Sequence, residues 1–81
     1  MRTIDILHKI KWDKSEKPEE TFVFYFDRIA KKLIKIPFTS IKDIGKNFIT
    51  VENDGEEIEI PIHRIEEIRR KEKLIWAKKD I

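Results

Sequence analysis

The strongest constraint on the fold is the alternation of side chains from Thr21 to Ile29. Alternate side chains of an extended chain point to opposite faces. One face would carry Phe22, Phe24 and Phe26, and the other Val23, Tyr25 and Asp27. Because aromatic and β-branched residues are favoured in strands, the segment predicts a central β-strand.

An amphipathic helix is predicted before this strand. The apolar residues within 3–12 fall in one sector at the α-helical period, and Thr3 is placed to cap the helix. The stretch 13–20 is polar, contains a proline and has no apolar period, so it predicts a loop.

A second strand is predicted over 33–38, where alternation resumes. Pro37 has no N–H to donate to a neighbour, so this strand should lie at an edge of the sheet or end there. Residues 39–45 predict a short helical turn or loop, with Gly45 as its end.

The sequence Asn53-Asp54-Gly55 predicts a tight hairpin between strands 48–52 and 56–62. Alternation in the second of these strands would point Ile58, Ile60 and Ile62 inward. The period then breaks near His63, which indicates a turn or bulge. A last hairpin is predicted from 67–70 and 74–78, and a continuous helix over 65–78 is the competing interpretation.

Together these elements predict one α+β domain over residues 1–81. It comprises an N-terminal helix and a five- to six-stranded antiparallel sheet. Because exposed strand edges invite unwanted pairing, we expect the sheet to curl into a partly barrel-like shape with the helix against one side.

Composition removes several classes of function. The chain has no cysteine, which excludes disulfides, thiolate metal sites and a cysteine nucleophile. It has no apolar run near membrane-spanning length and an acidic residue near its start, so we expect a cytoplasmic protein with no membrane partner. Abundant Lys, Glu and Ile is typical of thermophilic proteins.

Two neighbouring residues at the period break, His63 and Arg64, form the main candidate site. Arg can bind a phosphate through two parallel hydrogen bonds. His adds a hydrogen-bond donor on a ring whose charge depends on pH. The alternative is structural, with His63 bonded to a loop carbonyl and Arg64 paired with a glutamate. Near the helix end, Trp12 would close the core or stack on a base, and Asp13 would cap the following loop.

The predicted central strand supplies Tyr25, Asp27 and Arg28. A plain interpretation is an ion pair between Asp27 and an arginine. Alternatively, Arg28 contacts a phosphate and Tyr25 stacks on a base, with basic clusters around 31–35 and 69–73 adding positive charge. The net charge of +2 is modest for a nucleic-acid-binding protein, because acidic residues are interspersed.

Catalysis and metal binding have little support in the sequence. There is no glycine-rich phosphate loop, no nucleophile motif and no zinc ligand set, and the only histidines are His8 and His63. We therefore expect a non-enzymatic protein without cofactor or metal.

The order of several short motifs resembles a known family, the RNA cyclic-group end recognition domain. These motifs are Ile10-Lys11-Trp12-Asp13, Tyr25-Phe26-Asp27-Arg28, Ile36-Pro37-Phe38, Ile60-Pro61-Ile62-His63-Arg64-Ile65 and Ile75-Trp76. The likeness spans about residues 4–78. In this respect the chain is similar to stand-alone archaeal members of the family.

The resemblance implies a binding module for RNA ends that carry a cyclic phosphate, with a place in RNA repair or processing. It places the family's polar and aromatic residues on Trp12, Asp13, Tyr25, Asp27, Arg28, His63, Arg64 and Trp76. Lys78 stands where similar members have arginine, which keeps the charge and loses the bidentate fork.

From the residues and the resemblance together, we expect Arg28, His63 and Arg64 to surround one hollow that holds the terminal phosphate. Asp13 or Asp27 would orient these basic groups. Two alternatives stay open. One is a protein-interaction adaptor that binds a partner's strand at the edge near Pro37. The other is a metal-free phosphodiesterase that uses His63.

Overall fold

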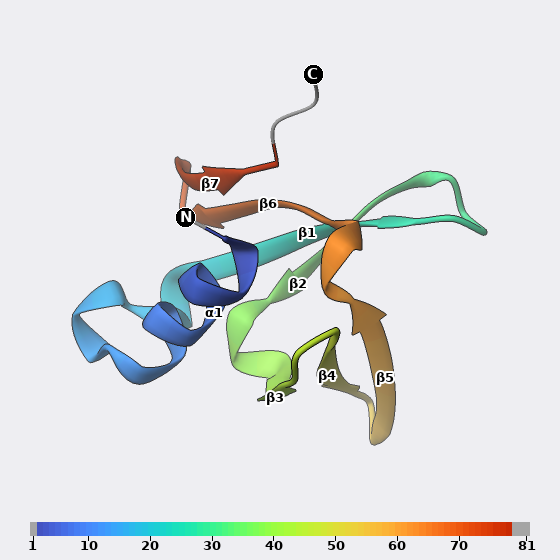
Figure 1. Cartoon of the computed structure of the whole chain (residues 1–81), viewed down its shortest axis with the longest axis horizontal. Helices are drawn as coiled ribbons and strands as arrows, with labels where there is room; N and C mark the ends of the chain where they lie inside the picture. Colours follow the sequence, from blue (N-terminus) through green and yellow to red (C-terminus); the bar gives the residue numbers. More distant parts are fainter. Residues whose placement is uncertain (1, 79–81) are drawn as a thin grey trace.

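The protein is described by a computed structural model that covers residues 2–78. A single α-helix is followed by seven strands, with short 3-10 turns between several of them (Figure 1). The elements are α1 (Thr3–Trp12), β1 (Thr21–Asp27), β2 (Lys32–Pro37), β3 (Ile41–Ile44), β4 (Phe48–Asn53), β5 (Glu56–Pro61), β6 (Ile65–Arg70) and β7 (Lys73–Ala77). The predicted α+β class is confirmed.

The strands form two antiparallel sheets rather than one curled sheet. The first has the order β2-β1-β6-β7, and the second has the order β3-β4-β5. Seven strands are therefore present within residues 2–78, more than the five or six expected. The additional strand is β3, which lies in the segment expected to be a turn or loop.

The local signals explain most of the element boundaries. β1 ends at Asp27, two residues before the predicted end, because its carboxylate accepts hydrogen bonds from the backbone N–H of Ile29 and Ala30 and closes the turn. β2 lies at an edge of the first sheet, as Pro37 predicted. The helix begins at Thr3, but Thr3 does not cap it. Arg2 is the extended residue before the first turn, and no side chain caps the helix there.

The C-terminal third forms the predicted hairpin, and the competing helix over 65–78 is wrong. A 3-10 turn, η4 (Ile62–Arg64), separates β5 from β6 and accounts for the break in the apolar period. The turn between β6 and β7 is closed by Lys71, which adopts a left-handed conformation with φ of 54°.

The core lies between the helix and the two sheets. Its fully buried side chains come from all three, and include Leu7 and Ile10 of α1, Val23 of β1 and Ile49 of β4. Val23 is buried while Phe22, Phe24 and Phe26 lie on the opposite face of β1, with Phe26 38% exposed.

The prediction that Ile58, Ile60 and Ile62 all point inward is only partly correct. Ile60 is buried, whereas Ile58 is 41% exposed and Ile62 is half-buried in η4. The reason is that β5 is an edge strand of its sheet, and the tip of the β4–β5 hairpin extends away from α1 (Figure 1).

Candidate functional site

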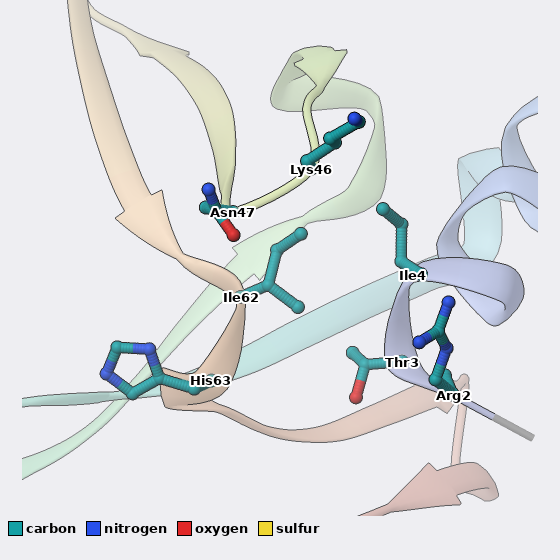
Figure 2. Close-up of a pocket in the computed structure, with 7 residues that line it drawn as sticks. All are labelled: Arg2, Thr3, Ile4, Lys46, Asn47, Ile62 and His63. Carbon is teal, nitrogen blue, oxygen red and sulfur yellow. The ribbon is translucent and has the colours of Figure 1, made fainter.

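A hollow on the described surface lies where the start of α1, the β3–β4 loop and η4 meet. Its volume is about 530 Å³. We call it the cationic hollow, and define it by its lining residues: Arg2, Thr3, Ile4, Lys46, Asn47, Ile62 and His63. Figure 2 shows Ile4 and Ile62 near its centre, Lys46 and Asn47 along one side, and His63 at the far side from Arg2.

Backbone hydrogen bonds hold η4 and the β3–β4 loop together at this hollow. The N–H of Ile62 donates to the carbonyl of Asn47 at 2.9 Å, and the N–H of Gly45 donates to the carbonyl of Phe48 at 2.8 Å. A Cβ at position 45 would lie 3.2 Å from that same carbonyl oxygen, so glycine allows the loop to close tightly. These contacts fix the positions from which Lys46 and His63 project.

The lining of the cationic hollow contains three basic side chains and no carboxylate. Within residues 2–78, the side chains of Arg2, Lys46 and His63 form no ion pair or hydrogen bond. A concave surface lined by charge of one sign concentrates the electrostatic potential and attracts the opposite charge. The arrangement therefore favours an anionic ligand.

Lys78 contacts the backbone of His63, one of the lining residues. Its Nζ donates to the backbone carbonyl of His63 at 2.8 Å and lies 3.9 Å from a carboxylate oxygen of Glu66. This hydrogen bond connects the end of β7 to η4.

A second, smaller hollow of about 130 Å³ lies between β1 and β5. It is lined by Tyr25, Phe26, Asp27, Ile58, Glu59, Ile60, Pro61 and Arg64. Burial, with a smaller contribution from the neighbouring Asp27 carboxylate, raises the pKa of the Tyr25 phenol. The phenol therefore stays protonated at neutral pH and can donate a hydrogen bond.

Four of the predicted site residues line these hollows, one in the first and three in the second. His63 lines the cationic hollow, whereas Arg64 lines the second one together with Tyr25 and Asp27. Arg28 is exposed in the β1–β2 turn and lines neither. The expected convergence of Arg28, His63 and Arg64 on a single hollow is therefore absent, because consecutive residues of the η4 turn project to different sides.

The plain structural interpretations of these residues are not observed either. Asp27 caps the β1–β2 turn instead of pairing with an arginine. Neither the hydrogen bond from the His63 side chain to a loop carbonyl nor the Arg64–glutamate ion pair occurs within residues 2–78. Whether these residues bind RNA stays a prediction.

At the end of the helix, Asp13 closes a turn while Trp12 faces solvent. The Asp13 carboxylate accepts hydrogen bonds from the Ser15 hydroxyl at 2.6 Å and the Ser15 N–H at 3.0 Å, and these bonds lower its pKa. The predicted cap at Asp13 is confirmed. Trp12 is 76% exposed, so it does not close the core, and its stacking role stays a prediction.

Sequence reasoning missed Arg2, Lys46 and Asn47. Each is a common surface residue in its local context, and no spacing rule links the chain start to the β3–β4 loop. The signal that was available is the break in alternation at His63, a residue that lines the cationic hollow.

The described part of the chain has neither a metal-binding cluster nor a membrane-spanning helix. Between residues 2 and 78, no group of three or more His, Asp or Glu side chains is gathered so as to hold a metal ion. The single helix there is too short to cross a membrane.

The fold and the hollow define a small α+β domain with a basic, concave site, and sequence comparison identifies its family. A family model described as the MJ1316 RNA cyclic group end recognition domain matches residues 1–78. The chain belongs to this family.

Curated relatives are uncharacterised archaeal proteins of similar length. The chain is 32% identical to the UPF0248 protein SSO2687 of Saccharolobus solfataricus, over 99% of this chain and all of that protein. It is 36% identical to a UPF0248 protein of Metallosphaera sedula, over 91% of this chain and 88% of that protein. No solved structure matches the chain.

Proposed function

We propose that the protein binds the terminal nucleotide of an RNA that ends in a cyclic phosphate, and that the cationic hollow is the binding site. The observation that carries the proposal is the lining of this hollow: Arg2, Lys46 and His63 without a carboxylate. The family description supplies the class of ligand.

The size of the hollow suits a nucleotide better than a bare phosphate ion. Its volume of about 530 Å³ falls within the range of small-ligand pockets. The basic residues lie around Ile4 and Ile62, and in Figure 2 the ends of the Lys46 and His63 side chains point away from Ile62. The two apolar side chains would take the base or ribose, while a basic side chain at the rim binds the phosphate.

The second hollow is a poorer site for a phosphate. The guanidinium of Arg64 shares it with the carboxylates of Asp27 and Glu59, which would repel an anion. We therefore assign the phosphate to the cationic hollow and leave Arg64 and Tyr25 to contact a neighbouring nucleotide. Lys78 would act as a positioning residue through the His63 carbonyl. Binding of RNA also agrees with the cytoplasmic location expected from composition.

The test is fluorescence anisotropy with one short RNA sequence carrying a cyclic phosphate, a linear phosphate or a hydroxyl at its 3′ end. The proposal expects the tightest binding for the cyclic end. Equal affinity for all three ends, or no binding, would overturn it.

A matched pair of variants separates the site from general charge. Lys46→Ala removes a basic group of the hollow, and Lys42→Ala removes one that is paired at the surface with Glu57. Lys46→Ala should weaken RNA binding. It should also reduce the slope of the logarithm of affinity against the logarithm of salt concentration by roughly one. Lys42→Ala should change neither, and identical effects of the two variants would contradict the assignment.

The same RNA separates binding from catalysis. After prolonged incubation with the protein, the cyclic phosphate should be recovered intact, as expected for a binding module. Appearance of a linear phosphate product that depends on His63 would instead support the phosphodiesterase alternative.

A second candidate function, strand addition to a partner protein, draws on one observation. β2 is an edge strand, so one side of its backbone is open to pairing. However, Lys32, Lys35 and Pro37 are residue types that protect edges from pairing. Binding that is insensitive to salt would favour this candidate over RNA recognition.

A further inference from the structure

The outer face of the four-stranded sheet carries a row of aromatic side chains. Val23 is fully buried and points into the core, so Phe22, Phe24 and Phe26 point to the outer face. In the antiparallel register, Lys35 lies beside Phe24 and Leu33 lies beside Phe26. On the other side, Arg69 lies beside Phe22, and Leu74 lies beside Arg69. We call this surface the phenylalanine face, defined by Phe22, Phe24, Phe26, Leu33, Lys35 and Leu74.

Much of the phenylalanine face is open. Phe26 is 38% exposed, Leu33 is 46% exposed and Leu74 is 47% exposed. The helix contributes Leu7 and Ile10 to the core on the opposite side of the sheet. Several exposed large apolar side chains on one face of a small charged domain indicate a binding site.

The charges around this face fit an anionic partner. The Nζ of Lys35 lies 4.3 Å from the centre of the Phe22 ring and forms no ion pair within residues 2–78. Arg28 lies in the turn directly beyond Phe26, and it is exposed and likewise unpaired in the described part of the chain. The carboxylate of Glu67 is paired with Arg69 at 2.7 Å. Basic groups thus lie at both ends of the row.

The row also has the geometry of a stacking platform. Alternate residues of a strand are about 6.6–6.8 Å apart, so the rings follow one another along β1 at a regular interval. β1 lies between β2 and β6, so its backbone groups are already paired and a ligand must bind through side chains. Aromatic rings on an open sheet, flanked by basic groups, bind successive bases of single-stranded nucleic acid.

We propose that the phenylalanine face binds the unpaired bases of single-stranded RNA through stacking on Phe22, Phe24 and Phe26, with Lys35 and Arg28 contacting the phosphates. The choice of RNA rests on the proposed function, but the surface is separate from the cationic hollow. The face would bind nucleotides that lie further from the RNA end, so that affinity grows with RNA length.

The experiment compares a cyclic-phosphate dinucleotide with a fluorescent RNA of about eight nucleotides that has the same end. Phe24→Leu and Phe26→Leu keep apolar side chains and remove the rings. Each should weaken binding of the longer RNA by roughly five- to a hundredfold and leave the dinucleotide unaffected. Phe24→Tyr keeps a ring and should bind like the wild type.

Phe48→Leu is the matched control, because Phe48 is a 46% exposed phenylalanine of the other sheet. It should leave affinity for both RNAs unchanged. Circular dichroism checks that each variant is folded, and Phe26→Leu, at the most exposed ring of the row, keeps the test valid where Phe24→Leu does not fold. Unchanged affinity of Phe26→Leu for the longer RNA would overturn the proposal.

The outcomes for the two sites are distinguishable. One outcome is that the ring variants weaken binding of the longer RNA while RNAs with cyclic and hydroxyl ends bind equally. This would support RNA binding by the phenylalanine face and overturn the proposed end recognition. If end discrimination persists and the ring variants bind like the wild type, only the phenylalanine face fails. Dimerisation that Phe26→Leu abolishes, with RNA affinity unchanged, would assign the face to a protein partner and overturn the proposal.

Discussion

The ion pair between Glu16 and Arg70 connects the loop after α1 to the end of β6, and it provides a direct test of the packing. The Nη2 atom of Arg70 donates to a carboxylate oxygen of Glu16 at 2.6 Å. The two side chains are 21% and 22% exposed, and the Arg70 Nε is buried without a partner. The Glu16 carboxylate is therefore the main partner that offsets the burial of the positively charged Arg70 guanidinium.

The free energy of unfolding should fall clearly in Glu16→Ala. Removing one partner of a buried pair costs about 3–5 kcal/mol, whereas an exposed pair contributes about 0–1 kcal/mol. Because about a fifth of each side chain is exposed to solvent, the pair lies between these two cases. We expect the free energy of unfolding to fall by about 2 kcal/mol. In a domain of this size that corresponds to a fall of roughly 8–16 °C in Tm.

The assay is thermal and urea unfolding followed by circular dichroism. The matched control is Glu57→Ala, which breaks the Lys42–Glu57 ion pair. That pair has a similar distance of 2.7 Å, but both of its side chains are about half exposed. That variant should unfold at nearly the wild-type temperature. In a double-mutant cycle, Glu16→Ala with Arg70→Met should lose less than the sum of the single changes. Equal effects of Glu16→Ala and Glu57→Ala, or an additive cycle, would refute the reasoning.

Two further predictions concern a titration and a turn. Tyr25 is the only tyrosine, so absorbance near 295 nm should report a pKa above its ordinary value of 10.0. Asp27→Asn should move this pKa only part of the way back, because burial is the larger cause. The folded state holds the phenol proton more tightly than the unfolded chain, so this stabilisation is complete below the unfolded pKa and is lost as pH rises through the folded one. A pKa at or below 10.0 would contradict this account. Gly55 has φ of +82° in the β4–β5 turn, so Gly55→Ala should lower the free energy of unfolding by about 1 kcal/mol, although no atom beyond the two neighbouring residues lies within 4 Å of the new Cβ. Urea unfolding checks this, with an unchanged midpoint as the contrary result.

The elements with strong local signals were predictable from the sequence. The helix, the β1–β2 pair and the Asn53-Asp54-Gly55 hairpin each depend on periodicity and turn chemistry within a few residues. β3 was missed because it is only four residues long, and Ile41 and Ile44 are three apart, which resembles a helical turn. A register shift between β3 and β4 places both isoleucines inward within a strand.

Long-range placement could not be predicted from these patterns. β1 has apolar residues on both faces, so alternation alone cannot tell whether Val23 or the phenylalanines face the core. The same limit applies to the site. Periodicity marked His63, but only the folded chain brings Arg2 and Lys46 to the same hollow.

The most direct test of the central claim uses the two histidines as internal probes. Imidazole NMR signals of His63 and His8 are followed while an RNA with a terminal cyclic phosphate is added. His63 lines the cationic hollow, and His8 is exposed on α1 outside it. We predict that the His63 signals shift with saturation and those of His8 do not, and that Lys46→Ala weakens the response. Unchanged His63 signals at RNA concentrations that saturate binding would show that the RNA end lies elsewhere.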